Sequence, residues 1–409
     1  MAQMPDGDPA PLNGLLPASA AEGFSQRTLH AYLHIPFCRV RCGYCDYNTY
    51  TSSELQGETQ NSFLDNLLRE ISFSKNVLQQ LSSQHRKFST VFFGGGTPTQ
   101  LASEQLALVL ETLRNEFGIE ENAEVTTEAN PDTVDERYLN TLADAGFTRV
   151  SIGMQSSVAS VLKTLDRTHN PENVAKAVAA AKSAGLQVSV DLIYGTPGES
   201  LDDWRESLST AISLEPNHIS AYSLIVEPGT KLARQVRSGE LNQPSDDDHA
   251  DKYEIAEQMI SAAGFDWYEV CNWSQGDSTM SQHNLAYWRS NDWWGYGPGA
   301  HSHVGGTRWW NVKHPSAYAQ RLVAGESPAL ARETLDDTAK ATERILLELR
   351  LREGMPIDYL KSVNPQAAKP ISQFIADGTV NAEDAIRGQL TLTLKGRLLA
   401  DALVRDLLG

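Results

Sequence analysis

Three cysteines crowd into eight positions of the chain, Cys38, Cys42 and Cys45, with the spacing C-x3-C-x2-C. Thiolate is the preferred ligand of iron–sulfur clusters, and one short loop can place three sulfurs on one face of a cubic cluster. Three ligands leave the fourth iron open to a chelating amine and carboxylate. The alternative is zinc, which normally takes four closed ligands. Since Cys271 is far away in sequence and no histidine lies at finger spacing, we predict a [4Fe-4S] cluster.

A second group of residues suited to ligand binding falls at the ends of predicted strands. Glycines allow the backbone to approach a ligand closely, although a run of three also fits an ordinary turn. The carboxyl ends of parallel strands are where chemistry gathers in β/α barrels. The residues at these ends are His34, Gly94 to Thr97, Glu128, Gln155 and Asp191.

A third candidate is the segment HNLAYW, residues 283–288, within an aromatic-rich region. Seven of the eight tryptophans lie between Trp267 and Trp310. A neutral imidazole such as His283 is a good axial ligand of iron, and aromatic walls suit a flat macrocycle. The alternative is a packed aromatic core in which His283 is only hydrogen-bonded. From the residues alone both interpretations stay open.

The elements that must position these residues alternate short apolar runs with helical stretches, which is typical of βα units and a parallel sheet. Six strands are predicted, over residues 29–35, 89–95, 123–129, 149–155, 187–195 and 218–226. Helices are predicted over 61–73, 104–117, 136–146 and 173–185. Right-handed crossovers curl such a sheet. The predicted fold class is α/β, a partial (β/α)6 TIM-like barrel with a C-terminal mixed α+β region.

Composition divides the rest of the chain. Residues 1–28 mix Pro, Gly, Ala and Ser without a signal-peptide pattern, and we expect a disordered tail. The barrel is predicted over 29–262, and the aromatic-rich segment over 263–330 is not expected to be another βα repeat. Residues 331–409 read as two helices, a short strand pair within 385–396 and a final helix. They predict a winged-helix-like cap with a structural role.

The bulk properties of the 409 residues limit the partners. A net charge of −18 has the wrong sign for binding phosphates, so we expect neither nucleic acid nor an anionic membrane as a partner. No apolar run is long enough to cross a membrane, so membrane association is expected only through a partner protein. The clustered cysteines do not resemble a disulfide framework, which favours reduced thiols and a cytoplasmic location.

The cysteine spacing, with an aromatic residue before the last cysteine and a strand before the first, resembles the radical SAM superfamily. The run FFGGGTPT, residues 92–99, resembles its glycine motif, which lies along the methionine end of S-adenosylmethionine (SAM). In that superfamily a reduced cluster passes an electron to SAM and cleaves a C–S bond. Resemblance to the oxygen-independent coproporphyrinogen III oxidase family, from residue 28 to about 400, implies these SAM contacts: Tyr32, Tyr44, Gly95, Gly96, Thr97, Glu128, Gln155, Arg167 and Asp191.

The HNLAYW segment resembles the H-N-x-x-Y-W signature of the haem-chaperone branch of that family. This resemblance implies haem contacts at His283, Asn284, Tyr287 and Trp288. Oxidases of the family carry a further cysteine two positions after the third, where this sequence has Tyr47. They also have a longer N-terminal region, so both differences disfavour the oxidase.

Two hypotheses follow. The first is a haem-binding and haem-transfer protein that keeps a SAM-coordinated cluster. The second is an enzyme, a coproporphyrinogen oxidase that converts two propionates to vinyls, and whether the chain is an enzyme stays open. The expected cofactors are a [4Fe-4S] cluster, SAM and haem. The expected partners are haem or a porphyrin, an unidentified acceptor protein and a reductant such as a flavodoxin or ferredoxin.

Overall fold

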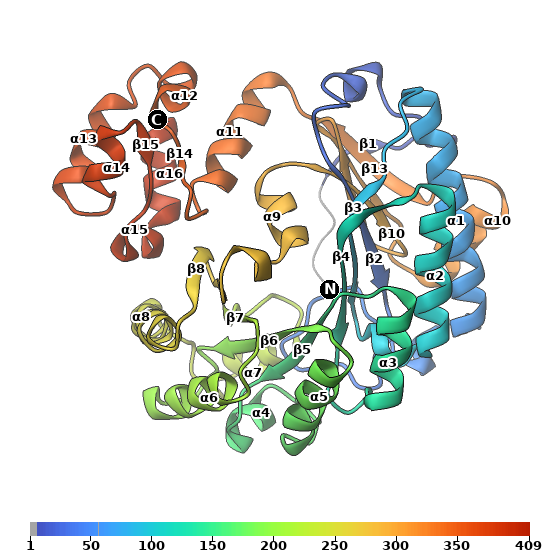
Figure 1. The fold of residues 1–409 in the computed structure, drawn as a ribbon, viewed down its shortest axis with the longest axis horizontal. Coiled ribbons are helices and arrows are strands. Elements are labelled where there is room, and N and C mark those ends of the chain that lie inside the picture. Colours follow the sequence, from blue (N-terminus) through green and yellow to red (C-terminus); the bar gives the residue numbers. More distant parts are fainter. Residues whose placement is uncertain (1–5, 56) are drawn as a thin grey trace.

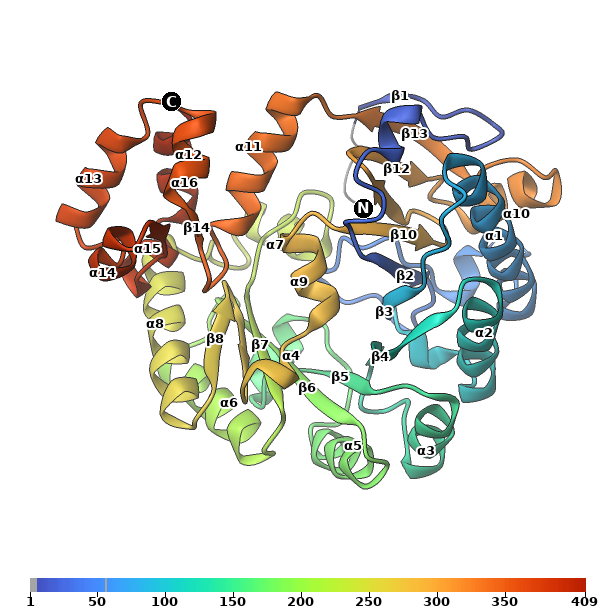
Figure 2. The ribbon, with the colours of Figure 1, turned by 45° about the horizontal axis from the view of Figure 1, so that its top comes forward.

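The computed structural model describes residues 6–55 and 57–409, and its centre is one 13-stranded sheet. Six strands in the middle of this sheet pair in parallel and in chain order, each with the next. They are β2 (Leu29–Ile35), β3 (Phe88–Gly95), β4 (Ile119–Ala129), β5 (Arg149–Gln155), β6 (Gln187–Tyr194) and β7 (His218–Ser223). The predicted α/β class and the six parallel strands are confirmed. The sheet curves into an open arc (Figure 2).

Helices cover the outer face of this arc (Figure 1). They are α1 (Gln60–Leu81), α2 (Ser103–Glu116), α3 (Glu136–Ala145), α5 (Glu172–Ser183), α6 (Leu201–Ser213) and α8 (Asp246–Ala262). Two short helices, α4 (Ala159–Thr164) and α7 (Lys231–Arg237), instead pack beside the cysteine loop, where Leu232 N donates to Gly43 O (2.9 Å). Apolar residues at alternate strand positions, such as Val150 and Ile152 of β5, are fully buried in the main core. Successive side chains of a strand point to opposite faces of the sheet. The strand residues that alternate with these apolar ones therefore face the inside of the arc.

The aromatic-rich segment 263–330 extends the same sheet at both edges. The hairpin β8 (Asp266–Glu269) and β9 (Asn272–Ser274) pairs antiparallel with β7. After α9 (Gln282–Trp288), β10 (Asp292–Tyr296) runs parallel beside β2 and leads into an antiparallel meander. The rest of the meander is β11 (His301–Val304), β12 (Thr307–Asn311), α10 (Pro315–Val323) and β13 (Ala329–Thr334). The predicted boundary at residue 331 therefore falls inside a strand of the main sheet.

The expectation of a disordered N-terminal tail is wrong for residues 6–28, and residues 1–5 lie outside the described part. Strand β1 (Asp8–Pro9) pairs with β13, Asp8 opposite Arg332. Ala20 and Phe24 are buried in the main core. Arg86 lies over the Phe24 ring, 3.6 Å from its centroid, and forms an ion pair with Asp292 of β10. These contacts anchor the tail to the sheet edge.

The C-terminal region packs around a small core of its own beside the arc (Figure 1). It comprises α11 (Asp337–Glu348), β14 (Met355–Pro356), α12 (Ile357–Val363), α13 (Ala368–Ala376), α14 (Ala382–Ile386), β15 (Gln389–Leu390), α15 (Leu394–Leu398) and α16 (Ala400–Leu408). The strand pair predicted within 385–396 is wrong, because Gln389–Leu390 pairs with Met355–Pro356 instead. The winged-helix assignment itself stays a prediction. The described residues also form short 3-10 helices at Ala18–Ala21, Ser52–Glu54, Pro98–Gln100 and Asp277–Thr279.

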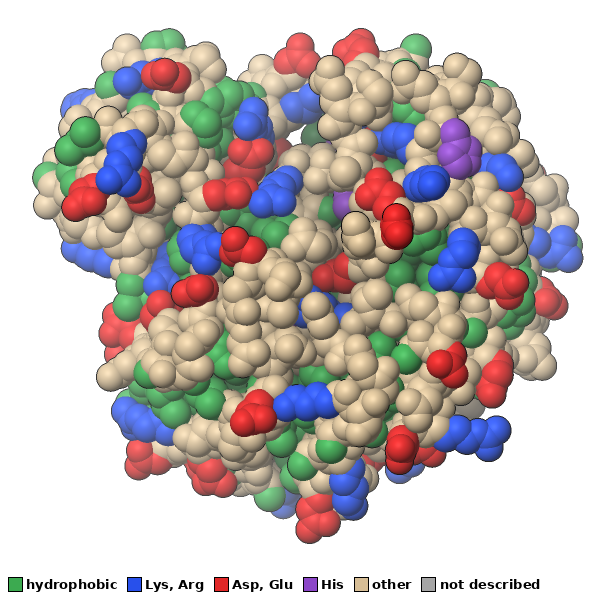
Figure 3. All heavy atoms as spheres, in the orientation of Figure 1, with side chains coloured by type: hydrophobic (Ala, Val, Ile, Leu, Met, Phe, Trp, Pro, Cys, Tyr) green, Lys and Arg blue, Asp and Glu red, His purple; other side chains and the backbone are tan. Residues whose placement is uncertain are grey.

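No helix in the described part of the chain combines the length and hydropathy needed to cross a membrane. The face of the molecule in Figure 3 carries acidic and basic side chains interspersed with each other.

Candidate functional site

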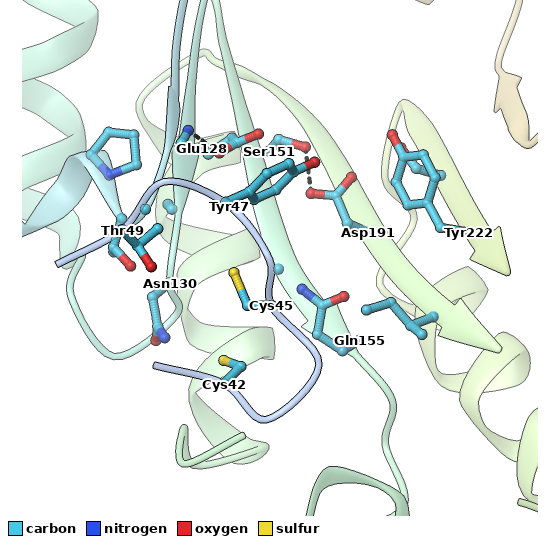
Figure 4. A pocket seen from close by; sticks show the side chains of 18 of the residues that line it. Cys42, Cys45, Tyr47, Thr49, Glu128, Asn130, Ser151, Gln155, Asp191 and Tyr222 are labelled. Atoms are coloured by element: carbon cyan, nitrogen blue, oxygen red, sulfur yellow. Dashed lines mark hydrogen bonds between the residues drawn. The ribbon is translucent and has the colours of Figure 1, made fainter. Parts of the chain in front are cut away.

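A cavity of about 540 Å³ lies inside the arc, at the carboxyl ends of the parallel strands (Figure 4). All three cysteines of the C-x3-C-x2-C loop line it. Every residue predicted to contact SAM lines it as well: Tyr32, Tyr44, Gly95, Gly96, Thr97, Glu128, Gln155, Arg167 and Asp191. The structure therefore brings together residues that are spread over more than 150 positions of the sequence.

The cysteine loop follows β2 and is fixed at both ends by backbone hydrogen bonds. Cys38 N donates to Tyr50 O (3.1 Å), and Gly43 N donates to Leu165 O (3.2 Å). All three thiols are half-buried and none is in a disulfide. Burial raises the pKa of Cys38, and raises that of Cys45 to about 12. Thiols in this setting hold their protons until a cation or a metal replaces them.

The surroundings of the loop fit an iron–sulfur cluster. Arg167 Nη1 lies 3.7 Å from Cys42 Sγ and supplies a positive charge beside the thiols. The glycine motif packs directly on the loop, since a Cβ on Gly96 would lie 2.7 Å from Phe37 O and 3.1 Å from Cys38 Sγ. Among the described residues no three or more His, Cys, Asp or Glu side chains are placed to hold a single metal ion.

Two half-buried carboxyl groups face the cavity, Glu128 of β4 and Asp191 of β6, with β5 between their strands. Glu128 Oε2 accepts one hydrogen bond from Gly95 N (3.1 Å), and Asp191 Oδ2 accepts one from Ser151 Oγ (2.8 Å) (Figure 4). Burial and then the charge of Asp191 raise the pKa of Glu128 to about 8, and burial raises that of Asp191. Two desolvated acids so close together favour a ligand that brings positive charge or hydroxyl donors.

The end of β5 is strained at the cavity. Gln155 has φ +65°, an unusual conformation for a residue other than glycine. A Cβ on Gly153 would lie 2.7 Å from Arg167 Nη2 and 2.8 Å from Gln155 Nε2. Arg167 Nη2 donates to Gly153 O (2.9 Å), so the glycine allows the guanidinium to lie against the strand. Strain of this kind concentrates at binding sites.

The inner strand face also carries cavity residues that the sequence interpretation missed. They occupy alternate positions of β4 to β7: Thr126, Arg149, Ser151, Ser189, His218 and Ser220. Outward neighbours such as Val150 and Val190 are buried under the helices. The period-two alternation of polar and apolar residues is visible in the sequence and indicates a polar interior.

Helix α9 carries the HNLAYW segment into the cavity wall. His283, Asn284 and Tyr287 line the cavity, whereas Trp288 does not. Trp288 instead packs against a separate apolar cluster that contains Leu285 and Leu351. Three of the four predicted haem contacts therefore line the same cavity as the three cysteines.

His283 is almost completely buried, with 2% of its surface exposed, and both ring nitrogens have protein partners. Nδ1 lies 2.6 Å from Thr90 Oγ1, and Nε2 lies 3.0 Å from Tyr287 Oη. The ring stacks on Phe92, with centroids 5.0 Å apart. Burial holds its pKa well below the ordinary value, so the imidazole is neutral. Iron could bind Nε2 only after the contact with Tyr287 opens.

A buried ion pair holds α9 in this position. Glu124 of β4 lies 3.3 Å from Arg149 of β5, and its carboxylate accepts hydrogen bonds from the backbone N–H of Gln282 and His283, both at 3.0 Å. Arg149 in turn donates to Thr279 O (2.9 Å). The pair therefore links the strands of the arc to the beginning of α9.

Comparison with known proteins identifies the family. Residues 32–211 match the model of the radical SAM superfamily. "Heme chaperone HemW" of Mycobacterium tuberculosis is 46% identical over 379 residues, which are 92% of this chain and 94% of that protein. The chain belongs to the HemW family. "Heme chaperone HemW" of Bacillus subtilis is 32% identical over 387 residues, 93% of this chain and 99% of that protein.

A solved structure of coproporphyrinogen III oxidase (HemN) from Escherichia coli shares the fold of this HemW-family chain. The TM-score is 0.80 over 95% of this chain and 92% of that chain, at 21% sequence identity. Membership of the radical SAM superfamily implies a [4Fe-4S] cluster and SAM. The cavity described above offers both of them suitable side chains.

Tyr47 stands where the oxidases of the family carry their further cysteine. Its side chain lies in the cavity between Glu128 and Asp191, with 64% of its surface exposed (Figure 4). No fourth thiol of this HemW-family chain lines the cavity, because Cys271 sits in the turn between β8 and β9. Cys271 is half-buried.

Proposed function

We propose that the protein is a haem chaperone that binds haem, transfers it to an acceptor protein and carries a SAM-coordinated [4Fe-4S] cluster. The observation that carries the proposal is that His283, Asn284 and Tyr287 line the same cavity as Cys38 and Cys45. HemW relatives named as haem chaperones over almost their full length support it. The cytoplasmic location and the acceptor stay predictions.

The chain's own residues divide the work within the cavity. Cys38, Cys42 and Cys45 would hold three irons and leave the fourth free for the amine and carboxylate of SAM. When bound, the cluster supplies one electron at a time. Glu128 and Asp191 would accept hydrogen bonds from SAM, and Gly96 allows the glycine motif to lie against the loop.

Haem binding requires a rearrangement at α9. His283 and Tyr287 stand four residues apart on one face of the helix and share a hydrogen-bond contact of 3.0 Å. Rotation of the Tyr287 hydroxyl away from Nε2 would release the neutral imidazole for iron, while Thr90 keeps Nδ1 and the ring plane fixed. Tyr287 therefore competes with iron for Nε2.

Haemin titration of anaerobically reconstituted protein tests this proposal. Wild type should bind haemin stoichiometrically, His283→Ala should lose the binding, and Tyr287→Phe should bind at least as tightly because the competing hydroxyl is gone. His301→Ala is the control, since His301 is exposed and does not line the cavity. Equal haemin uptake by His283→Ala would contradict the assignment of the ligand.

The oxidase alternative is tested on the same preparation. With SAM and a reductant, no conversion of coproporphyrinogen III to protoporphyrinogen IX should be found by chromatography. Turnover would replace the chaperone by the enzyme. Cys42→Ala should abolish the broad absorbance near about 400 nm that is typical of iron–thiolate clusters, and a persistent cluster in that variant would refute the ligand set.

A further inference from the structure

A second recess, of about 560 Å³, lies on the outer side of the cysteine loop. The loop residue Arg41 and the guanidinium of Arg167 line both this recess and the SAM cavity. Arg167 Nη1 lies 3.7 Å from Cys42 Sγ. One side chain therefore separates the recess from a predicted cluster ligand, and this recess is a short route from solvent to the cluster.

The recess is basic although the chain is acidic. Four cations line it, Arg41, Lys163, Arg167 and Lys231, against one carboxylate, Asp166. Arg41 is paired with Glu54 at 3.2 Å, so Lys163 and Arg167 carry the positive charge that no carboxylate balances. Asp166 is neutralised by Lys231 at 2.8 Å, while the net charge of the whole chain is −18. A local field opposite in sign to the whole protein selects an acidic partner and orients it.

Two exposed cations beside the loop are free to contact a partner. Lys163 of α4 lines the recess, and Arg39, which lies between Cys38 and Cys42 in the chain, is exposed at the SAM cavity. Neither side chain forms an ion pair or hydrogen bond with any described residue. Val40, next to Arg39 in the chain, lines the recess and exposes 47% of its surface. A small apolar centre with a charged rim is typical of weak, transient redox interfaces.

The floor of the recess holds a polar group without a partner. His169 is 4% exposed, and neither ring nitrogen has a hydrogen-bond partner among the described residues. Burial, and then the neighbouring Arg167, lower the pKa of His169 to about 4, so the ring is neutral and has one N–H to donate. Buried polar groups are rarely left unsatisfied, which indicates that an acceptor enters from outside.

We propose that this recess, together with Arg39, is the docking surface for an acidic one-electron carrier protein that reduces the cluster. The inference rests on the proposed function, since it needs the cluster at Cys38, Cys42 and Cys45. With a ferredoxin as carrier, [2Fe-2S]⁺ is oxidised to [2Fe-2S]²⁺ while [4Fe-4S]²⁺ becomes [4Fe-4S]⁺. One electron moves, no bond forms or breaks, and no proton is needed.

The test measures reduction of the reconstituted cluster by a reduced, acidic [2Fe-2S] ferredoxin in stopped flow. For wild type the second-order rate should fall as salt rises, because salt screens the attraction. The double variant Arg39→Glu/Lys163→Glu should react at least about tenfold more slowly at low salt. It should also bind oxidised ferredoxin more weakly in calorimetry. Lys369→Glu is the matched control, since Lys369 is an exposed lysine of α13, remote from the loop.

A small neutral reductant, photoreduced deazaflavin, needs no docking surface. It therefore distinguishes a failure of the proposed function, which requires the cluster, from a failure of the docking surface. If wild type forms no cluster, the proposed function fails. If all variants hold a cluster that deazaflavin reduces equally, and ferredoxin reduces the double variant at the wild-type rate, the docking surface is refuted. Slower reduction of the double variant by both reductants would also refute it, because the substitutions would then act on the cluster itself.

Discussion

Two carboxyl groups with raised pKa values show how the cavity differs from the antiparallel meander β10 to β13, which we call the outer sheet. Glu70 of α1 accepts hydrogen bonds from Tyr318 Oη (2.5 Å), Gly297 N (2.7 Å) and Asn311 Nδ2 (2.8 Å). Glu128 accepts one, from Gly95 N. Burial raises the pKa of both groups, to about 7 for Glu70 and about 8 for Glu128. Burial and pKa alone therefore do not separate a structural acid from a ligand-binding one.

The number of partners that the chain itself provides does separate them. The three donors to Glu70 come from the β10–β11 turn, β12 and α10, so this carboxyl joins α1 to the outer sheet. Glu128 faces a cavity and a second acid, Asp191. Since buried polar groups are normally satisfied, we expect a ligand to supply the partners that Glu128 lacks.

The largest expected effect is structural. Glu70→Ala leaves three buried donors without an acceptor and creates a cavity, and we expect it to lower the free energy of unfolding by about 3–5 kcal/mol. Urea titration followed by circular dichroism measures this loss. Glu116→Ala is the control, because Glu116 forms only a surface ion pair with Lys75 and should cost less than about 1 kcal/mol. A similar small loss for Glu70→Ala would show that the outer sheet does not depend on this carboxyl.

Substitution of the cavity carboxyl Glu128 should affect the binding of SAM more than the stability of the fold. Glu128→Gln keeps the side-chain volume but cannot ionise, whereas the positive charge of bound SAM would favour the Glu128 carboxylate. The substitution should weaken SAM binding about tenfold to a hundredfold, the value of a charged hydrogen bond. Calorimetric titration of SAM into the reconstituted protein measures it. Glu121→Gln, an exposed position of the same strand, should bind SAM as wild type does. Unchanged affinity in Glu128→Gln would remove Glu128 from the site.

The raised pKa of Glu128 should also make the free energy of unfolding depend on pH. The folded pKa of Glu128, about 8, lies above its ordinary value of 4.5. The folded state therefore holds this proton longer, and its contribution to stability is present below about pH 4.5 and is lost as pH rises to about 8. One such group changes the unfolding free energy by at most about 1.4 kcal/mol per pH unit. Between pH 6 and 7, cofactor-free Glu128→Gln should show a shallower decline than wild type in urea titrations, and parallel curves would contradict the assignment.

Local patterns made the parallel strands and the cysteine loop predictable. Alternation along β4 to β7 and a three-cysteine motif are both readable within about ten residues. Strand β1 carries no such signal, because its two residues form a strand only by pairing with Arg332 and Ala331. The strand Gln389–Leu390 likewise takes its partner from Met355–Pro356 rather than from the next few residues.

A motif also does not say which face of a helix each member occupies. Trp288 follows Tyr287 by one residue, and successive residues of a helix point about 100° apart. Tyr287 therefore reaches the cavity while Trp288 packs beside Leu285. The signature named these residues without predicting a helix, and only the tertiary structure shows that they form α9 and separates the cavity residues from the packing residue.

The smallest expected effect concerns the fourth cysteine. Cys271 occupies a turn with φ +88°, a conformation that favours glycine. Cys271→Gly should therefore change the unfolding free energy by less than about 1 kcal/mol, because relief of backbone strain offsets lost packing and added chain entropy. Cys271→Ala keeps the strain and should be the less stable of the two. Both variants should retain the full absorbance of the cluster, since three thiols of one loop hold it, and loss of that absorbance would bring Cys271 into the ligand set.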